Sequence, residues 1–133
     1  MREARCTCGE LKVEVSDEPK LVLMCHCEEC QRRTGAPFGV SAYFDQNDVR
    51  VSGTSSKYER TSDTGLAVTQ HFCPTCGSTL YWRAAFVPDF IGVATGCFSD
   101  PDFPAPQRSV YERSKHEWVT APHSAACFET TSI

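Results

Sequence analysis

Several features that mark other classes of protein are missing from these 133 residues. No apolar run approaches the roughly 20 residues that a membrane-spanning helix needs. The N-terminal stretch MREARCTCGE has no apolar segment of the kind found in secretory signals. Lysine and arginine do not gather into a basic stripe, and the formal net charge is −4. We therefore expect a cytoplasmic protein that binds neither membranes nor nucleic acid.

Helix signals are also scarce, and repeats, low-complexity tracts and linkers are absent. The one clear helix candidate is EECQRRTG at 28–35, which Gly35 ends. Short apolar or alternating stretches, typical of β-strands, occupy most of the rest; they lie at 11–15, 21–24, 37–44, 49–53, 67–72, 79–84, 90–98 and 109–112. We expect a single, mainly β domain spanning residues 1–133.

Cysteine is the residue type in excess, with nine in the chain. An odd number without an export signal argues against a framework of disulfides. Seven of the nine lie in close groups with CxC or CxxC spacing, which favours metal binding. Cys97 and Cys127 stand alone, and a role as small buried apolar residues is favoured for them.

Two close pairs resemble zinc knuckles. Cys6 and Cys8 precede a predicted strand, and Cys73 and Cys76 lie in CPTCG between two predicted strands. A CxxC at a hairpin tip points both sulfurs to one side, and Gly77 follows where a positive φ is often needed. Four thiolates complete a tetrahedral zinc site. We expect one structural zinc here, because the βαβ pattern of a redox CxxC is absent.

The segment CHCEEC at 25–30 holds three more thiols. Residues two apart in an extended segment point the same way, so Cys25 and Cys27 share a side, and the bend into the helix can turn Cys30 towards them. Three protein ligands leave a tetrahedral zinc one open position. A thiolate-rich site is a weak Lewis acid that prefers a soft fourth ligand. We therefore expect it to activate a substrate thiol for attack on an aldehyde rather than to activate water.

The alternative for this second cluster is a fourth protein ligand that closes it and makes both zinc ions structural. His26 lies inside the motif, although its neighbours point the other way in an extended stretch. More distant candidates are Cys97, Cys127, His71, His116 and His123. We favour the open site, because no second knuckle remains to complete it.

The order and spacing of CTCG, CHCEECQRRTG and FCPTCGSTLYW resemble the glutathione-dependent formaldehyde-activating enzyme family, whose domain is similar to that of centromere protein V. The resemblance covers residues 4 to about 118, which we expect to be the core of the domain. It implies an Mss4-like fold of antiparallel sheets with zinc knuckles and one short helix. It also implies a carbon–sulfur lyase that joins formaldehyde to glutathione.

The resemblance further implies two zinc ions per chain. By motif, the structural zinc is held by Cys6, Cys8, Cys73 and Cys76, and the exchangeable, catalytic zinc by Cys25, Cys27 and Cys30. The chain departs from the family pattern at three positions. Gln31 stands where a basic residue is usual, Cys97 replaces a threonine, and Ser99 replaces an acidic residue. These changes leave the metal framework intact and fall where a substrate would lie.

Three residues are candidates for substrate contact. Arg32 and Arg33 follow the third ligand and could hold a carboxylate of a glutathione-like thiol, although a solvated helix face is the simpler role. Cys97 could lie beside the open zinc position, although a place in the core is the simpler one.

Three functional hypotheses follow. The first, which we favour, is a zinc-dependent lyase that joins or releases a small aldehyde and a glutathione-like thiol. The second is a non-catalytic, zinc-stabilised binding module. The third is an enzyme similar to methionine sulfoxide reductase, with Cys97 or Cys127 as its nucleophile. No pattern in the sequence specifies the thiol, the aldehyde or the oligomeric state.

Overall fold

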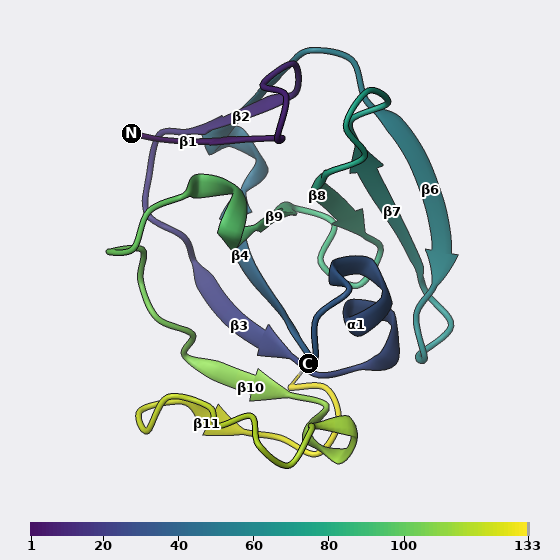
Figure 1. Ribbon diagram of the computed structural model, residues 1–133, viewed down its shortest axis with the longest axis vertical. Coiled ribbons are helices and arrows are strands. Elements are labelled where there is room, and N and C mark those ends of the chain that lie inside the picture. The colour runs from purple at the N-terminus through teal and green to yellow at the C-terminus, as the bar shows by residue number, and fades with distance from the viewer. Residues whose placement is uncertain (133) are drawn as a thin grey trace.

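β-strands dominate the computed structural model, which describes residues 1–132 (Figure 1). They form a three-stranded sheet in the order β1-β2-β5 and an eight-stranded sheet in the order β11-β10-β3-β4-β9-β8-β7-β6. Within residues 1–132 the one α-helix is α1 (Glu28–Thr34). The mainly β class with one short helix, predicted from the sequence, is therefore confirmed.

The small sheet pairs β2 (Lys12–Val15) with β1 (Arg2–Arg5) on one side and β5 (Val49–Ser52) on the other, both antiparallel. The sequence predicts β2 and β5 but not β1, which is too short and polar to show an alternating pattern. Of its four residues only Ala4 is buried, and the other three are half-buried or exposed.

The large sheet is mostly antiparallel, as the family resemblance implies, and is mixed only where β10 joins it. Strands β3, β4, β9, β8, β7 and β6 pair antiparallel in this order, whereas β10 lies parallel to both β3 and β11. The strands of this sheet are β3 (Leu21–Cys25), β4 (Gly39–Asp45), β6 (Ser56–Thr61), β7 (Ala67–Phe72), β8 (Thr79–Ala84), β9 (Phe90–Ala94), β10 (Arg108–Val110) and β11 (Ala126–Cys127). In Figure 1, β10 and β11 lie at the bottom and β6 and β7 at the right.

One predicted strand is shorter than the sequence indicates. The pattern at 90–98 predicts a continuous strand, but β9 ends at Ala94 and a 3-10 turn, η2 (Thr95–Phe98), follows. Ser99 closes this turn with a left-handed backbone, at φ 52°. Two further 3-10 turns are η1 (Gln46–Asp48) and η3 (Glu112–Ser114).

The main hydrophobic core joins the two sheets. Val13 and Val15 of the small sheet, with Leu11 just before β2, pack in one cluster with residues of the large sheet, namely Val22, Ala42, Phe44, Leu80, Ile91 and Val93. Each large apolar side chain buried here stabilises the fold by roughly 1.5–3 kcal/mol. The large sheet therefore uses one of its faces for the core.

The opposite face of the large sheet is different. Side chains alternate between the faces of a strand, so Val22 and Ala42 face the core while their neighbours Leu23 and Tyr43 face the other way. Residues of that second face line a cavity, together with Cys25 at the end of β3. Along these strands, the side chains on one face therefore stabilise the core, and those on the other face line a candidate site.

The helix α1 is short but well capped. The Sγ of Cys27 accepts a hydrogen bond from the backbone N–H of Cys30 at the N-cap, at 3.4 Å. Gly35 ends the helix with φ 67°, and its N–H donates to the carbonyl of Gln31. The caps fix the turn that carries the CHCEEC motif.

Candidate metal centres and the adjoining cavity

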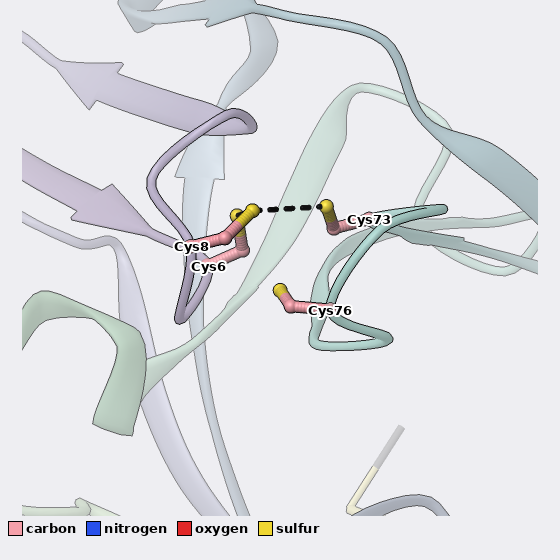
Figure 2. Close-up of side chains that lie close together, drawn as sticks. All are labelled: Cys6, Cys8, Cys73 and Cys76. Atoms are coloured by element: carbon pink, nitrogen blue, oxygen red, sulfur yellow. Dashed lines mark hydrogen bonds between the residues drawn. The ribbon is translucent and has the colours of Figure 1, made fainter.

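Four sulfur atoms converge between the N-terminal loop and the β7–β8 hairpin (Figure 2). Their Sγ atoms all lie within 4.8 Å of one another, with Cys6–Cys8 at 3.7 Å and Cys8–Cys73 at 3.6 Å. Cys76 completes the group. All four thiols are free, so none is joined by a disulfide. The cluster predicted from the spacing is therefore formed.

The two loops are shaped for this convergence. In the hairpin, the N–H of Gly77 donates to the carbonyl of Cys73 at 2.9 Å, and Gly77 has φ 80°, as its position in CPTCG predicts. Backbone N–H groups also point at sulfur: Leu11 donates to Cys6 Sγ at 3.3 Å, and Thr75 donates to Cys73 Sγ at 3.4 Å. Such donors stabilise thiolates.

Ser78 links the two loops. Its Oγ accepts a hydrogen bond from the backbone N–H of Thr7 at 3.2 Å and lies 3.4 Å from Cys76 Sγ. The hydrogen bond to Ser78 lowers the pKa of Cys76 to about 5. This hydrogen bond therefore favours the thiolate form of Cys76, which is the form that binds metal.

The geometry fits a tetrahedral zinc ion. A zinc–sulfur bond of about 2.3 Å places the sulfurs of a tetrahedral site about 3.8 Å apart. The separations of 3.6 and 3.7 Å in the structure are close to that value. A disulfide would need about 2.05 Å. The residues present therefore fit a four-thiolate metal site.

A second group of three sulfurs forms where β3 meets α1. Cys25 is the last residue of β3, Cys27 is the N-cap of α1, and Cys30 lies in its first turn. Their Sγ atoms lie within 4.8 Å of one another. The bend between strand and helix turns Cys30 back towards the other two, as the sequence predicts.

Electrostatics within this group favour a cation. Hydrogen bonds from Cys25 and Cys30 lower the pKa of Cys27 to about 2, whereas the neighbouring Cys27 and Cys30 raise the pKa of Cys25. Three thiolates at this spacing repel one another, and a divalent ion among them would offset that repulsion. Soft thiolate donors suit zinc. The trio therefore fits a zinc ion too.

No fourth protein ligand completes this trio within the described part of the chain, since no other His, Cys, Asp or Glu offers an atom within 4.8 Å of all three sulfurs. The ring of His26 instead contacts Ser109, and that of His71 contacts Ser55 and Tyr81. His116 contacts Gln31, His123 is exposed, and Cys127 is exposed on β11.

The trio lines a cavity of about 680 Å³ on the second face of the large sheet. Its walls are mostly apolar and include Leu23, Val68, Trp82, Phe86 and Val110. The cavity also exposes polar groups from four elements, namely Ser41, Tyr43, Arg60, Gln70 and Arg33. A pocket with apolar walls and a few convergent polar groups is typical of a small-molecule site.

The two candidate arginines of α1 lie on different sides. Arg33 lines the cavity, and its guanidinium stacks on Trp82 with Cζ 4.3 Å from the ring centroid. Arg32 is exposed and pairs with Glu29 at 2.9 Å and Glu28 at 3.5 Å. Of the two, only Arg33 is in a position to contact a molecule in the cavity.

Cys97 does not line the cavity. Its Sγ lies 4.0 Å from the carbonyl oxygen of Thr79, and burial raises the pKa of its thiol. A nucleophilic cysteine requires the opposite shift. The structure therefore adds no support to Cys97 as the nucleophile of the reductase-like hypothesis.

Sequence reasoning missed the strand residues of the cavity, above all Ser41, Tyr43 and Arg60. Their signal was the two-residue alternation itself, since Gly39, Ser41 and Tyr43 share one face of β4. That pattern could not be used before the pairing was known, because only the register of Gly39 with Cys25 places this face beside the sulfurs.

A mainly β fold with two cysteine clusters of metal-binding geometry defines the class of this protein. Residues 1–114 match the family described as glutathione-dependent formaldehyde-activating enzyme, and the chain belongs to that family. The resemblance inferred from the cysteine motifs is thereby confirmed.

The chain is also similar to one curated protein in sequence and to one solved structure in fold. Over 81 residues the chain is 31% identical to an uncharacterised lyase of Schizosaccharomyces pombe. The match covers 60% of this chain and 56% of the relative, so the chain spans little more than half of that protein. The crystal structure of a Rhodobacter sphaeroides protein aligns with a TM-score of 0.58, over 95% of this chain and 98% of that one. Its sequence identity of 21% makes this a likeness of fold alone.

The structure also bears on membranes. Within the residues that it describes, no helix combines the length and the apolar character needed to cross a bilayer.

Proposed function

We propose that this protein is a zinc-dependent carbon–sulfur lyase that joins, or releases, a small aldehyde and a glutathione-like thiol. One observation carries the proposal: the trio of Cys25, Cys27 and Cys30 lies in the wall of a cavity and has no fourth protein ligand among residues 1–132. Membership of the family and the lyase named among the relatives support the same class of reaction.

The two clusters would have different roles. Four cysteines, of which Cys8 and Cys73 are 65 residues apart, would hold a structural zinc that joins the N-terminal loop to the β7–β8 hairpin. Cys25, Cys27 and Cys30 would hold the second zinc. When bound there, the ion would supply an open coordination position that favours a sulfur ligand and keeps it deprotonated.

The protein's own residues would bind and orient the reactants. Arg33 and Arg60 both line the cavity, and neither forms an ion pair with a carboxylate within residues 1–132. A thiol that carries carboxylates, as glutathione does, would find these guanidinium groups near its sulfur. The apolar walls would exclude water from the reacting atoms.

The volume of the cavity also bears on the reactants. A space of about 680 Å³ is of the size that encloses a whole small molecule. Formaldehyde would fill a small part of it, so most of the space would be available to the body of the thiol.

We propose that the protein acts as a single domain and that Arg33, rather than Arg32 or Cys97, contacts the substrate.

Cobalt substitution tests the proposal. Co²⁺ in a cysteine site absorbs visible light, and the spectrum changes with the number of sulfur ligands. We expect glutathione to change the spectrum of the Co²⁺-loaded protein, and S-methylglutathione, which lacks a thiol, to leave it unchanged. Equal spectra with and without glutathione would mean that the trio accepts no external thiol, and both clusters would then be structural.

A further inference from the structure

Two residues with hydroxyl groups line the cavity from the same strand, β4. Ser41 and Tyr43 are two residues apart on β4, so both side chains leave the same face of the strand, roughly 7 Å apart along it. Both line the cavity, as do the three sulfurs. On the same face, Gly39 is paired with Cys25. Ser41 and Tyr43 therefore follow Gly39 along the face of β4 that begins beside the cysteine trio.

The hydroxyl of Ser41 has no partner inside the protein. The residue is buried, with 4% of its surface exposed, and its Oγ makes no hydrogen bond to any residue from 1 to 132. Among the described residues, the fully buried side-chain atoms without a partner are His26 Nδ1, Arg33 Nη2 and Thr95 Oγ1, so the Ser41 Oγ is still reached by solvent. Its remaining exposure is towards the cavity that it lines. The Ser41 hydroxyl is therefore available to a molecule bound in the cavity.

The hydroxyl of Tyr43 is set up as a donor. Its oxygen accepts a hydrogen bond from Trp82 Nε1 at 3.3 Å. No other hydrogen bond to this hydroxyl occurs within the described residues, so its proton has no acceptor in the protein. The oxygen is thus fixed by an N–H donor while the O–H remains available to a molecule in the cavity.

Trp82 itself is held firmly. Arg33 stacks on its ring, and a side chain at Gly92 would collide with its Nε1, Cδ1 and Cε2 atoms. The indole therefore rests against the backbone of β9 and has little room to turn. Because Trp82 orients the phenol oxygen, this packing makes the Tyr43 donor rigid before any ligand binds.

We infer that Ser41 and Tyr43 donate hydrogen bonds to the oxygen of the carbonyl reactant. This inference rests on the proposed function. In thiol addition, a bond forms between sulfur and the carbonyl carbon, the π electron pair moves to oxygen, and the proton lost by the thiol ends on that oxygen. Negative charge develops on the oxygen during this step, and fixed hydroxyl donors there stabilise the transition state more than the reactant.

The pair also makes the cavity selective for the functional group. A carbonyl oxygen, or the hydroxyl of the adduct, accepts from both donors, whereas a thiol alone does not. The two residues would therefore affect turnover and carbonyl binding but not thiol binding, which belongs to the cysteine trio and the arginines. A merely structural role would change all of these together.

The variants Tyr43→Phe and Ser41→Ala test the inference in the zinc-loaded protein, with adduct formation followed by NMR. We expect each to lower kcat on the order of 100-fold and to leave the glutathione-dependent change of the Co²⁺ spectrum intact. The matched controls are Tyr58→Phe, at an exposed tyrosine of β6, and Ser52→Ala, at an exposed serine of β5; both should keep the parent rate. Parent-like kcat in both cavity variants would overturn the inference.

A second readout does not depend on turnover. A thioester of glutathione carries a carbonyl beside sulfur and does not undergo the addition, so its infrared C=O stretch reports hydrogen bonding in the complex. We expect a lower frequency when it is bound to the parent than in an apolar solvent, and a return towards the solvent value in the double variant. Equal frequencies in parent and double variant would contradict the inference.

The two readouts separate the inference from the proposed function. A parent that forms no adduct but lowers the thioester frequency would refute the lyase and keep the carbonyl site. A parent that forms adduct at the same rate as both variants would keep the lyase and refute the role of the hydroxyls.

Discussion

The Nε2 atom of His26 lies 2.9 Å from the Oγ of Ser109, a residue 83 positions further along the chain. Ser109 gives its proton to Glu112 at 2.8 Å, so His26 is the donor to Ser109. Burial lowers the pKa of His26, which keeps the ring neutral. These hydrogen bonds tie His26, which lies between Cys25 and Cys27, to Ser109 of β10.

We predict that Ser109→Ala weakens metal binding at the trio. The change removes the hydrogen bond that orients His26, and loss of such outer contacts typically lowers metal affinity by about 10–100-fold. Competition with a chelator measures the effect. Ser55→Ala is the matched control, because it removes a serine–histidine contact of 3.1 Å, to His71, far in sequence from the trio. Equal metal loss in the two variants would contradict the role of Ser109.

Arg33→Ala should raise KM for glutathione about 10–100-fold, since a hydrogen bond to a charged group is worth about 1.5–3 kcal/mol. It should have little effect on KM for an uncharged thiol such as 2-mercaptoethanol. Arg32→Ala is the control, because that side chain pairs with Glu28 and Glu29 outside the cavity. If Arg32→Ala had the larger effect, the assignment of the two arginines would be reversed.

Gly39→Ala should raise KM for glutathione, although less than Arg33→Ala does, while the positive charge of Arg33 is kept. An added Cβ would lie 2.6 Å from Arg33 Nη2, so the guanidinium would have to move. Because that atom ends a flexible side chain, we expect a loss of stability of only about 1 kcal/mol. Thermal unfolding and KM for glutathione check the two parts. Gly96→Ala, with no heavy atom within 4 Å of its added Cβ, should change neither.

The two metal sites should respond differently to loss of one ligand. Cys27→Ser should remove about one zinc per chain and the activity, while the protein stays folded on its four-cysteine site. Cys73→Ser should unfold the protein, because a structural zinc contributes about as much free energy as the whole domain has in reserve. Metal analysis with circular dichroism distinguishes these outcomes. Unfolding by Cys27→Ser would indicate that the trio is structural.

The cysteine clusters and most strands were predictable from sequence because their signals are local. CxC, CxxC and CHCEEC each place their sulfurs within one turn, and a strand shows its own alternation. That Cys8 and Cys73, 65 residues apart, lie in one cluster was inferred only because a zinc site needs four ligands. Their sulfur separation of 3.6 Å agrees with that inference.

The cavity could not be predicted in the same way. Its floor combines strands that are distant in sequence, and the face of β4 that it uses depends on the pairing of Gly39 with Cys25. Adjacent residues of a helix point about 100° apart, so Arg32 and Arg33 had to point in different directions. Which of the two faces the cavity was decided by how the helix packs on the sheet. The parallel pairing of β10 and β11 likewise depends on a long connection with no local pattern.

X-ray absorption at the zinc edge tests the open trio most directly. Four and three cysteines shared between two ions predict an average of about 3.5 sulfur ligands per zinc in the protein alone, and about 4 after addition of glutathione. An average of about 4 before any thiol is added, unchanged afterwards, would show that the protein fills the position itself and would contradict the proposed chemistry.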